Sequence, residues 1–327
     1  MEPGKPYDRL KIEISGWCNG MCKYCPTGQQ NRISRTSQAH TYMDFPRFRE
    51  LMQMLLQKQI IQPGITVDLF CWNEPFLNPD LPQIASWLSQ NRFRYILSTN
   101  ASRVPELTED CDFSGLKYLT ISMPGFSQGS YDKMHGFSFP AIVCNIRRLL
   151  SDLQKVNFRG RTEIVCHVYK FNLEEIEAAA AFADSLKVEF YPVLANPGSY
   201  EGLRGILSRD ARITREYEKD LFTDYIPGLI RQRPAGYCCD QGEILILNTE
   251  GMVVKGWCTD GLGAYCAQDY LVCDPFAADL RQIQAAKQAA MEGSSLCEEC
   301  RRLGIDYFST HNRKYTHTLT DKMRKAL

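Results

Sequence analysis

The sequence lacks the features that would direct the chain to a membrane or to nucleic acid. None of its apolar runs reaches the roughly 18 residues of a membrane-spanning helix, and the N-terminus has no apolar stretch typical of a secretory signal. Thirty-eight basic and 38 acidic residues leave a formal net charge of zero, which gives no electrostatic attraction for nucleic acid or an anionic membrane. We therefore expect a cytoplasmic protein with neither kind of partner.

Cysteine is the residue type present in excess, with 14 in 327 residues. Without a secretory signal we do not expect disulfides, because the cytosol keeps thiols reduced. Clustered cysteines in that compartment more often bind metals or take part in catalysis. Three of the cysteines lie within residues 18–25 and seven lie between residues 238 and 300, so the sequence predicts two separate thiol sites.

The rest of the composition is that of a folded α/β protein. A hydrophobic share of 44% supports a core, and 23% charged residues argue against disorder. Short apolar runs alternate with helical patterns over the first two thirds of the chain, which predicts β/α units. The expected strands are Leu10–Ser15, Ile65–Cys71, Tyr95–Ser98, Leu116–Ser122, Glu163–Tyr169 and Val188–Val193. The expected helices are Phe45–Lys58, Leu81–Gln90, Ala141–Leu153 and Leu173–Leu186.

Six β/α units favour a partial (β/α)6 TIM-like barrel over a sandwich. Most of the expected strands are near-continuous hydrophobic runs, typical of parallel strands covered on both faces. In such folds the functional side chains lie at the C-terminal ends of the strands. We therefore predict a barrel over residues 1–198 with its site at those strand ends.

The chain after residue 198 follows a different pattern. Residues 199–235 predict a helical or irregular connecting segment, residues 236–305 a small second domain, and residues 306–327 a surface tail rich in Lys, Arg, Thr and His. The second domain is expected to contain a β-hairpin with a glycine turn, then a helix and a CxxC pair. These features are expected at Glu243–Asn248, Met252–Trp257, Asp279–Met291 and Cys297–Cys300.

The first cluster, Cys18, Cys22 and Cys25, forms a C-x3-C-x2-C loop directly after the first expected strand. Three thiolates on one short loop can each bind one iron of a 4Fe–4S cube. The fourth iron is then left without a protein ligand, and a substrate or cosubstrate can bind there. The competing interpretation is a set of incidental or zinc-binding cysteines, although structural zinc normally takes four ligands with CxxC pairs.

This loop, with Tyr24 as the aromatic residue before its last cysteine, resembles the cluster motif of radical S-adenosylmethionine (radical SAM) enzymes. The resemblance implies that S-adenosylmethionine (SAM) binds the open iron of the 4Fe–4S cluster. Reductive cleavage of SAM then gives a 5′-deoxyadenosyl radical, which removes a hydrogen atom from an unactivated carbon. The resemblance also implies a flavodoxin- or ferredoxin-type reductant as a partner.

Further matches to this family lie at successive strand ends. Cys71-Trp-Asn-Glu-Pro75 stands where the family usually has Gly-Gly-Glu-Pro, so Glu74 is the implied partner of the SAM ammonium group. Trp72 and Asn73 replace the two glycines, which is a departure from the usual backbone contacts. The residues that the resemblance places against SAM are Tyr24, Asn73, Glu74, Ser98, Asn100 and Ser122.

The C-terminal cysteines resemble the SPASM extension of radical SAM enzymes, or its shorter form, the twitch domain. There one cysteine precedes a hairpin, one follows it, and a CxxC beyond a helix completes the ligands of an auxiliary 4Fe–4S cluster. No cysteine follows Cys300, so the resemblance implies one auxiliary cluster rather than two. The implied ligands are Cys239, Cys258, Cys297 and Cys300, with Cys238 as the alternative to Cys239. A zinc ribbon remains the alternative for the same four thiols.

This layout is similar to that of radical SAM dehydrogenases of aminocyclitols, which implies a sugar or aminocyclitol substrate in natural-product biosynthesis. The radical would take hydrogen from a carbinol carbon, a base the hydroxyl proton, and the auxiliary cluster the second electron, leaving a ketone. The close variant is epimerisation, in which a cysteine returns a hydrogen atom to the opposite face. Cys238, Cys266 and Cys273 are the candidate donors.

Two other functions stay open at this point. Many SPASM and twitch enzymes modify ribosomally synthesised peptides. Only 17 residues precede Cys18, so a peptide substrate would require a separate leader-recognition partner. The second is a non-enzymatic iron–sulfur electron carrier, but a carrier would ligate all four irons with protein, and the first loop supplies three cysteines.

Overall fold

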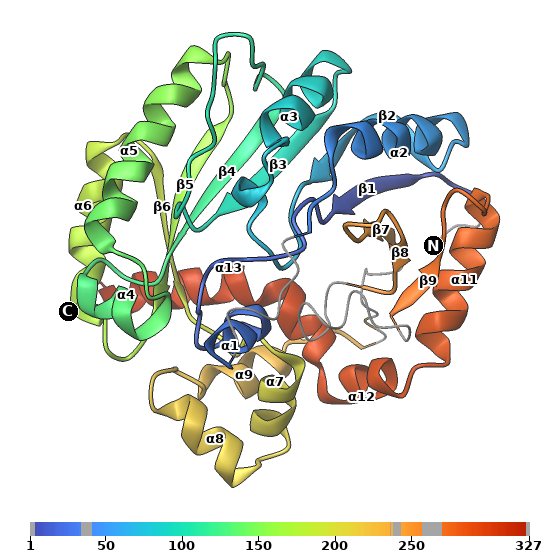
Figure 1. Ribbon diagram of the computed structural model, residues 1–327. Helices are drawn as coiled ribbons and strands as arrows, with labels where there is room; N and C mark the ends of the chain where they lie inside the picture. Colours follow the sequence, from blue (N-terminus) through green and yellow to red (C-terminus); the bar gives the residue numbers. More distant parts are fainter. Residues whose placement is uncertain (1–3, 34–40, 236, 238–242, 257–269, 325–327) are drawn as a thin grey trace.

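The computed structural model describes residues 4–33, 41–235, 237, 243–256 and 270–324 (Figure 1). Within them lies one nine-stranded sheet, in the order β6-β5-β4-β3-β2-β1-β7-β8-β9. Strands β1 to β6 run parallel, β7 is parallel to β1, and β8 and β9 are added antiparallel. The strands are β1 (Tyr7–Ile12), β2 (Ile61–Asp68), β3 (Arg94–Thr99), β4 (Leu116–Met123), β5 (Arg161–Val168), β6 (Glu189–Leu194), β7 (Ile244–Leu247), β8 (Val253–Val254) and β9 (Leu271–Cys273).

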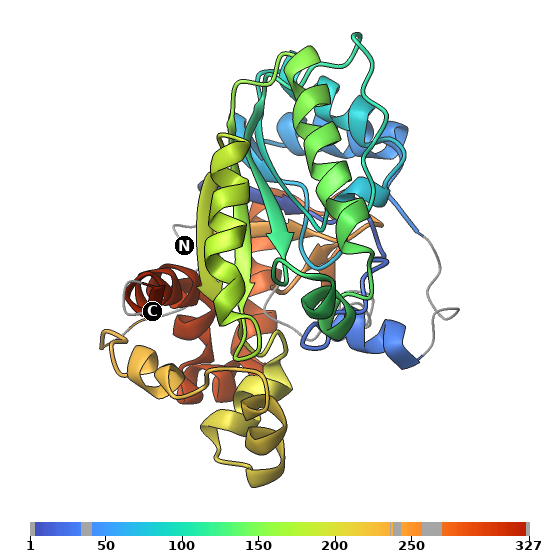
Figure 2. The same cartoon turned by 90° about the vertical axis from the view of Figure 1, so that its left-hand side faces the viewer.

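Helices α2 (Phe45–Gln57), α3 (Leu81–Gln90), α5 (Phe139–Lys155) and α6 (Ile176–Ser185) lie along the outer face of β1 to β6 (Figures 1 and 2). The expected partial (β/α)6 TIM-like barrel is thereby confirmed. None of the described helices is long and apolar enough to span a membrane. The other helices are α1 (Pro26–Ile33), η1 (Pro75–Leu77), α4 (Gln128–Met134), η2 (Leu173–Glu175), α7 (Tyr200–Leu207), α8 (Ala211–Glu218), α9 (Tyr225–Ile230), α11 (Leu280–Glu292), α12 (Ser295–Leu303) and α13 (Ile305–Arg324).

Local signals fix where two of these helices begin. The Asp44 side chain accepts a hydrogen bond from the Arg47 amide at the start of α2, and proline follows in the first turn, where its missing N–H costs nothing. At the start of α11, Asp279 and Gln282 form a capping box, each side chain accepting from the other's backbone N–H at 2.8 Å. Such reciprocal caps satisfy amides that a helix leaves unpaired.

The two faces of the barrel strands differ. On β4, Leu119 and Ile121 are fully buried in the core that the outer helices complete. The alternating residues Thr120 and Ser122 are partly exposed, because successive side chains of a strand point to opposite faces. The expectation of strands covered on both faces is therefore wrong. Within the described ranges, the inner face carries polar side chains, and no layer of α-helices that matches the outer one covers it, although α13 packs on β6.

The expected hairpin is present as β7 and β8, which pair through Leu247 and Val253, with Gly251 at φ +83° in the turn. A positive φ suits glycine because it lacks a β-carbon. Strand β7 does not belong to a separate small sheet. It pairs with β1 from Arg9↔Ile244 onward and so extends the barrel sheet at its N-terminal strand.

The segment expected as a surface tail is a 20-residue helix, α13, so that expectation is wrong. Phe308, Asn312, Thr316 and Thr320 are buried, and their spacing of four places them on one face of the helix. This face packs on β6 and α9. The sequence did not indicate this buried helix face, because three of its four residues are polar. Hydrogen bonds to the preceding turn satisfy the two threonine hydroxyls.

Candidate active site

The three clustered cysteines lie on the loop between β1 and α1. The Cys25 amide donates to the Cys22 carbonyl at 3.3 Å, and the Gln29 amide donates to the Cys25 carbonyl at 2.8 Å, so Cys25 enters the first turn of α1. The Cys18 and Cys22 sulfurs lie near each other. A β-carbon built on Gly20 would stand 3.5 and 3.4 Å from them.

The ionisation of these thiols is disfavoured by their surroundings. Burial raises the pKa of Cys18, Cys22 and Cys25 above its usual value, and the negative charge of Glu74 raises the pKa of the first two further. Metal binding requires the thiolate, so a bound cation offsets this penalty. No three His, Cys, Asp or Glu side chains of the described ranges are close enough to share a single ion. A cube takes one thiolate per iron, and the loop fits that arrangement.

The shape of the loop depends on residues of α1. The Asn31 side-chain amide donates to the carbonyls of Cys18 and Gly20, both at 2.7 Å, and Asn31 is itself buried. Gly28 faces the Cys22 backbone, and a β-carbon there would stand closer than 3.0 Å to it. The loop and the first turns of α1 therefore fold as one unit.

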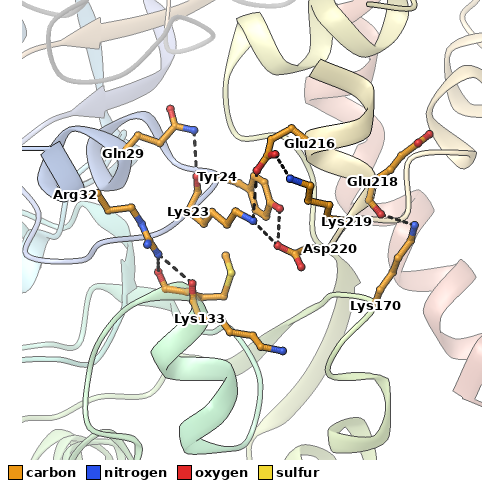
Figure 3. A network of polar contacts seen from close by, with 11 residues as sticks. Lys23, Tyr24, Gln29, Arg32, Lys133, Lys170, Glu216, Glu218, Lys219 and Asp220 are labelled. Atoms are coloured by element: carbon orange, nitrogen blue, oxygen red, sulfur yellow. Dashed lines mark hydrogen bonds and ion pairs between the residues drawn. The ribbon is translucent and has the colours of Figure 1, made fainter. Parts of the chain in front are cut away.

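A second set of contacts ties the loop to the rest of the chain (Figure 3). The Arg32 guanidinium donates to the carbonyl of Met21 at 2.7 Å. It also donates to the carbonyls of Lys133 and Met134 at 3.0 and 3.1 Å. These two carbonyls belong to the end of α4, so the cluster loop is fixed to the connection that follows β4.

Tyr24, expected against SAM, has its side chain committed elsewhere. Its hydroxyl donates to Asp220 Oδ2 at 2.8 Å, and Lys23 Nζ lies 2.7 Å from the same oxygen (Figure 3). The ring packs against Tyr217 and Tyr169, with centroids 5.1 and 6.3 Å away. Any contact of Tyr24 with SAM would therefore come from its backbone.

Glu74 and Asn100 meet where β2 and β3 end. Glu74 Oε2 accepts from the Asn100 amide at 2.7 Å, and Oε1 accepts from the Thr99 hydroxyl at 2.7 Å. Burial raises the pKa of Glu74 to about 7 despite these donors. The Asn100 side-chain nitrogen lies 3.7 Å from the Cys18 sulfur. The structure thus brings the implied ammonium partner of SAM, a strand-end amide and the cluster loop together.

Trp72 and Asn73, which stand where the family has two glycines, lie in a turn that Glu13 holds. Glu13 was not among the residues that the sequence indicated. Glu13 is buried, and its carboxylate accepts from the amides of Cys71 and Trp72 at 3.4 and 2.7 Å. Burial raises its pKa to about 7, while hydrogen bonds that include the Asn73 side chain act in the opposite direction. Asn73 Oδ1 is buried without a hydrogen bond among the described residues. A single Glu after an apolar strand was the only signal available for Glu13.

Ser98 and Ser122 lie on the inner face, on β3 and β4. The Ser122 hydroxyl is 3.0 Å from His167 Nε2 on β5. Burial and the nearby Arg313 charge lower the pKa of His167 to about 4, so its imidazole is neutral at neutral pH. His167 was also missed, because a lone histidine in a hydrophobic strand has no ligand spacing.

The described part of the second thiol site lies on α12. Cys297 and Cys300 are one helical turn apart and so on one face, with Cys300 buried and Cys297 half-buried. Glu299 on the same helix accepts from the Tyr200 hydroxyl at 2.7 Å. Cys273 ends β9, where burial raises its pKa. The other candidates, Cys238, Cys239, Cys258 and Cys266, lie outside the described residues.

A parallel half-barrel with a three-cysteine loop after its first strand defines a class of iron–sulfur enzymes. Residues 12–183 match the Radical SAM superfamily, which is more than half of the chain, and the chain belongs to that superfamily. Its members use a 4Fe–4S cluster together with SAM. Cys18, Cys22 and Cys25 are the residues of this chain that would hold the cluster.

The chain is also similar to individual proteins. It is 24% identical over 186 residues to an AdoMet-dependent heme synthase of Methanosarcina barkeri, which covers 55% of this chain and 48% of that relative. The match therefore spans about half the length of the relative. Streptococcus suis SuiB bound to the precursor peptide SuiA superposes with a TM-score of 0.56 at 12% identity, covering 91% of this chain and 67% of SuiB. The AdoMet-bound enzyme anSMEcpe gives 0.52 at 12%, covering 96% and 99%. At these identities the two structures show a shared fold.

Proposed function

We propose that this radical SAM enzyme acts on a carbinol carbon of a sugar or aminocyclitol in natural-product biosynthesis, by dehydrogenation or epimerisation. The bound cluster and SAM supply a 5′-deoxyadenosyl radical that abstracts a hydrogen atom from the substrate. The observation that carries the proposal is the polar inner face of the sheet beside the cluster loop. A polyhydroxylated substrate needs hydrogen-bonding partners, and a purely apolar barrel interior would not provide them.

The residues of the chain have distinct roles in this proposal. Cys18, Cys22 and Cys25 hold the cluster, and the Glu74 carboxylate accepts the ammonium group of SAM. Glu74 is suited to this role because its carboxylate is buried, where a cation interacts with it more strongly than in water. The remaining residues proposed to face SAM are Tyr24 through its backbone, Asn73, Ser98, Asn100 and Ser122.

We propose in addition one auxiliary 4Fe–4S cluster, which serves as the acceptor of the second electron in a dehydrogenation. Cys297 and Cys300 on one face of α12 support this. Cys239, or Cys238, and Cys258 complete the ligand set. In an epimerisation, Cys238, Cys266 or Cys273 would instead return a hydrogen atom. A flavodoxin- or ferredoxin-type protein would deliver the first electron.

A peptide substrate is the second candidate. It is favoured by the shared fold with SuiB, a protein whose structure holds the precursor peptide SuiA. The polar inner face also suits a peptide backbone. A separate leader-recognition partner would belong to this alternative.

Anaerobic reconstitution followed by counting of iron, sulfide and zinc tests the cofactors. About eight irons per chain are expected for two cubes, and about four irons with one zinc would remove the proposed electron acceptor. Dithionite-reduced protein should then convert SAM to 5′-deoxyadenosine. Failure of this cleavage at full iron content would contradict the enzyme and favour an electron carrier.

The reaction type follows from isotope tracing in deuterated water. A ketone product without deuterium on carbon is expected for dehydrogenation, whereas deuterium on the carbinol carbon indicates epimerisation through an exchangeable thiol. Cleavage of SAM that peptides stimulate and sugars do not would favour the second candidate.

A further inference from the structure

Helix α13 adds side chains to the inner face of the barrel. Arg313 and His317 are one turn apart on this helix and so lie on the same side. The Arg313 guanidinium pairs with Glu163 on β5. The His317 ring stacks on Tyr191 of β6, with centroids 3.7 Å apart and planes at 15°. A helix that the sequence predicted as a tail thereby completes the polar surface of β5 and β6.

Glu163 is held in place but keeps one oxygen for a ligand. Its Oε1 accepts from the Thr120 hydroxyl at 2.5 Å and from Arg313. Its Oε2 makes no hydrogen bond within the described residues, and 13% of the side chain is exposed. The Arg313 guanidinium also lies over the Tyr191 ring, 4.9 Å from its centroid. A carboxylate, a guanidinium and an aromatic ring thus meet at one place.

The strand register shows how this place relates to the SAM side of the barrel. Thr120 is level with Glu163, Val165 with Tyr191, and His167 with Val193. Glu163 therefore lies toward the start of β5, and His167 lies four residues closer to its C-terminal end. A ligand on this face would extend from Glu163 toward Ser122 and His167, where the strand ends carry the residues proposed to face SAM.

The chemistry of these groups fits a polyhydroxylated ring. A free carboxylate oxygen accepts from hydroxyl groups, and a guanidinium donates to hydroxyl oxygens. The Tyr191 ring is occupied by His317 and Arg313, but its hydroxyl can donate to and accept from the hydroxyl groups of a ligand. His167 is neutral, with Ser122, Arg313 and His135 as its polar and charged neighbours. A neutral imidazole can accept a proton at Nε2.

We propose that Glu163, Arg313 and Tyr191 bind the hydroxyls of a sugar or cyclitol, and that His167 accepts the proton of the hydroxyl being oxidised. This inference rests on the proposed function. The carbinol carbon loses its hydrogen atom to the 5′-deoxyadenosyl radical, which breaks the C–H bond. The O–H proton would pass through the Ser122 hydroxyl to His167 Nε2, because these two atoms lie 3.0 Å apart. The auxiliary iron–sulfur cluster would accept the remaining electron, and a C=O bond would form. His167 is restored when it releases its proton to water, and the acceptor is restored when it passes its electron to the flavodoxin- or ferredoxin-type protein.

The test measures 5′-deoxyadenosine formation by reconstituted full-length enzyme with D-glucosamine, D-glucose and myo-inositol as probes. In the wild type we expect at least one probe to increase the rate in a saturable manner. Glu163→Gln keeps the size of the side chain but removes its charge, and should raise the KM for that probe about tenfold or more. The matched control is Glu189→Gln, because Glu189 forms an exposed ion pair with Arg161 on the same two strands. It should leave KM unchanged.

A catalytic role for His167 predicts a different signature. His167→Asn retains a polar side chain that can bond to Ser122, so the KM for the probe should change less than about threefold. The rate of ketone formation should fall about 10²-fold or more, as for loss of a general base. Iron content and thermal unfolding of each variant report on folding.

The outcomes separate the two levels of the proposal. Absence of SAM cleavage both with and without probe would contradict the proposed function itself. Cleavage that no probe stimulates would overturn the sugar assignment. Equal KM values for Glu163→Gln and Glu189→Gln would overturn the subsite, and ketone formation by His167→Asn at the wild-type rate would overturn the proton acceptor.

Discussion

The two thiol regions hold their cysteines by different means. Cys18, Cys22 and Cys25 lie on a loop whose shape depends on hydrogen bonds from Asn31 and a close backbone approach at Gly28. Cys297 and Cys300 lie on α12, where the helix itself sets their spacing. The loop therefore depends on side-chain and backbone contacts with the following helix, whereas the spacing of the helical pair depends on the helix backbone alone. Substitutions of residues that are not ligands should therefore damage the first region more than the second.

The largest difference is expected when a ligand is removed from each region. Cys22→Ala should abolish SAM cleavage, because the catalytic cluster loses one of its three thiolates. Cys300→Ala should keep SAM cleavage and lose about four irons, since only the auxiliary cluster is affected. Iron analysis and 5′-deoxyadenosine assays of both variants provide the measurement. Equal loss of cleavage in both would mean that the regions do not act separately.

The next largest difference between the two regions is expected in the stability loss when one methyl group is added to a glycine of each. In Gly28→Ala the new β-carbon would lie closer than 3.0 Å to the Cys22 backbone, which cannot shift without moving the loop, at a cost of about 3 kcal/mol. Gly293→Ala, at the C-terminus of α11, places its β-carbon 3.3 Å from one carbonyl oxygen, and should change stability by less than about 0.5 kcal/mol. Urea unfolding of the metal-free proteins compares the two. Similar losses would contradict the close packing at Gly28.

A buried acid beside the first thiol region should make the free energy of unfolding depend on pH, and the acid of the second region should not. Burial raises the pKa of Glu13 to about 7 in the folded chain, from 4.5. Folding therefore favours the protonated form of Glu13. The stability that this form contributes is complete below about pH 4.5 and is lost as the pH rises through 7. Glu13→Gln should remove about 2 kcal/mol of this decline between pH 5 and 7.

The control for this prediction is Glu299 on α12. Hydrogen bonds from Tyr200 and Arg204 lower its pKa, so its titration lies below that window. Unfolding free energies of Glu13→Gln and Glu299→Gln between pH 5 and 7 make the comparison. A slope in Glu13→Gln as steep as that of the wild type would sink the assignment.

The smallest expected difference in unfolding free energy follows from removing a side-chain amide. Asn31→Ala removes the donor of the part-buried Cys18 carbonyl and of the buried Gly20 carbonyl, and should cost about 1.5 kcal/mol. Asn91→Ala removes an exposed hydrogen bond to the Trp87 carbonyl at the end of α3 and should cost less than about 0.5 kcal/mol. Urea unfolding checks both values. Equal costs would show that Asn31 is not a support of the loop.

Much of the fold could be predicted because its signals are local. Apolar runs marked all six barrel strands to within a few residues, and the expected helices Phe45–Lys58 and Asp279–Met291 lie close to α2 and α11. The meeting of Glu74 with Asn100 also followed from the sequence, because parallel strands place their C-terminal ends at one edge. The polar inner face did not follow, since apolar residues such as Ile96 and Val165 interrupt its pattern.

The remaining features depend on contacts between distant residues. The pairing of β7 with β1 joins residues more than 230 positions apart, and four apolar residues carry no signal for their partner strand. Helix α13 was missed because its buried stripe includes Asn312, Thr316 and Thr320. Glu13 and His167 each stand alone in the sequence, and only the fold brings them beside Trp72 and Ser122.

The pairing of β1 with β7 has a consequence for the order in which a newly made chain can fold. On the ribosome, β1 gains β2 as a neighbour once residue 68 has emerged, but its other edge waits for residue 247. An unpaired strand edge is prone to wrong pairing, and contacts so far apart in sequence form slowly. The strand that leads into the catalytic cysteines is therefore completed late in synthesis, and cluster insertion before that point would meet an unfinished sheet.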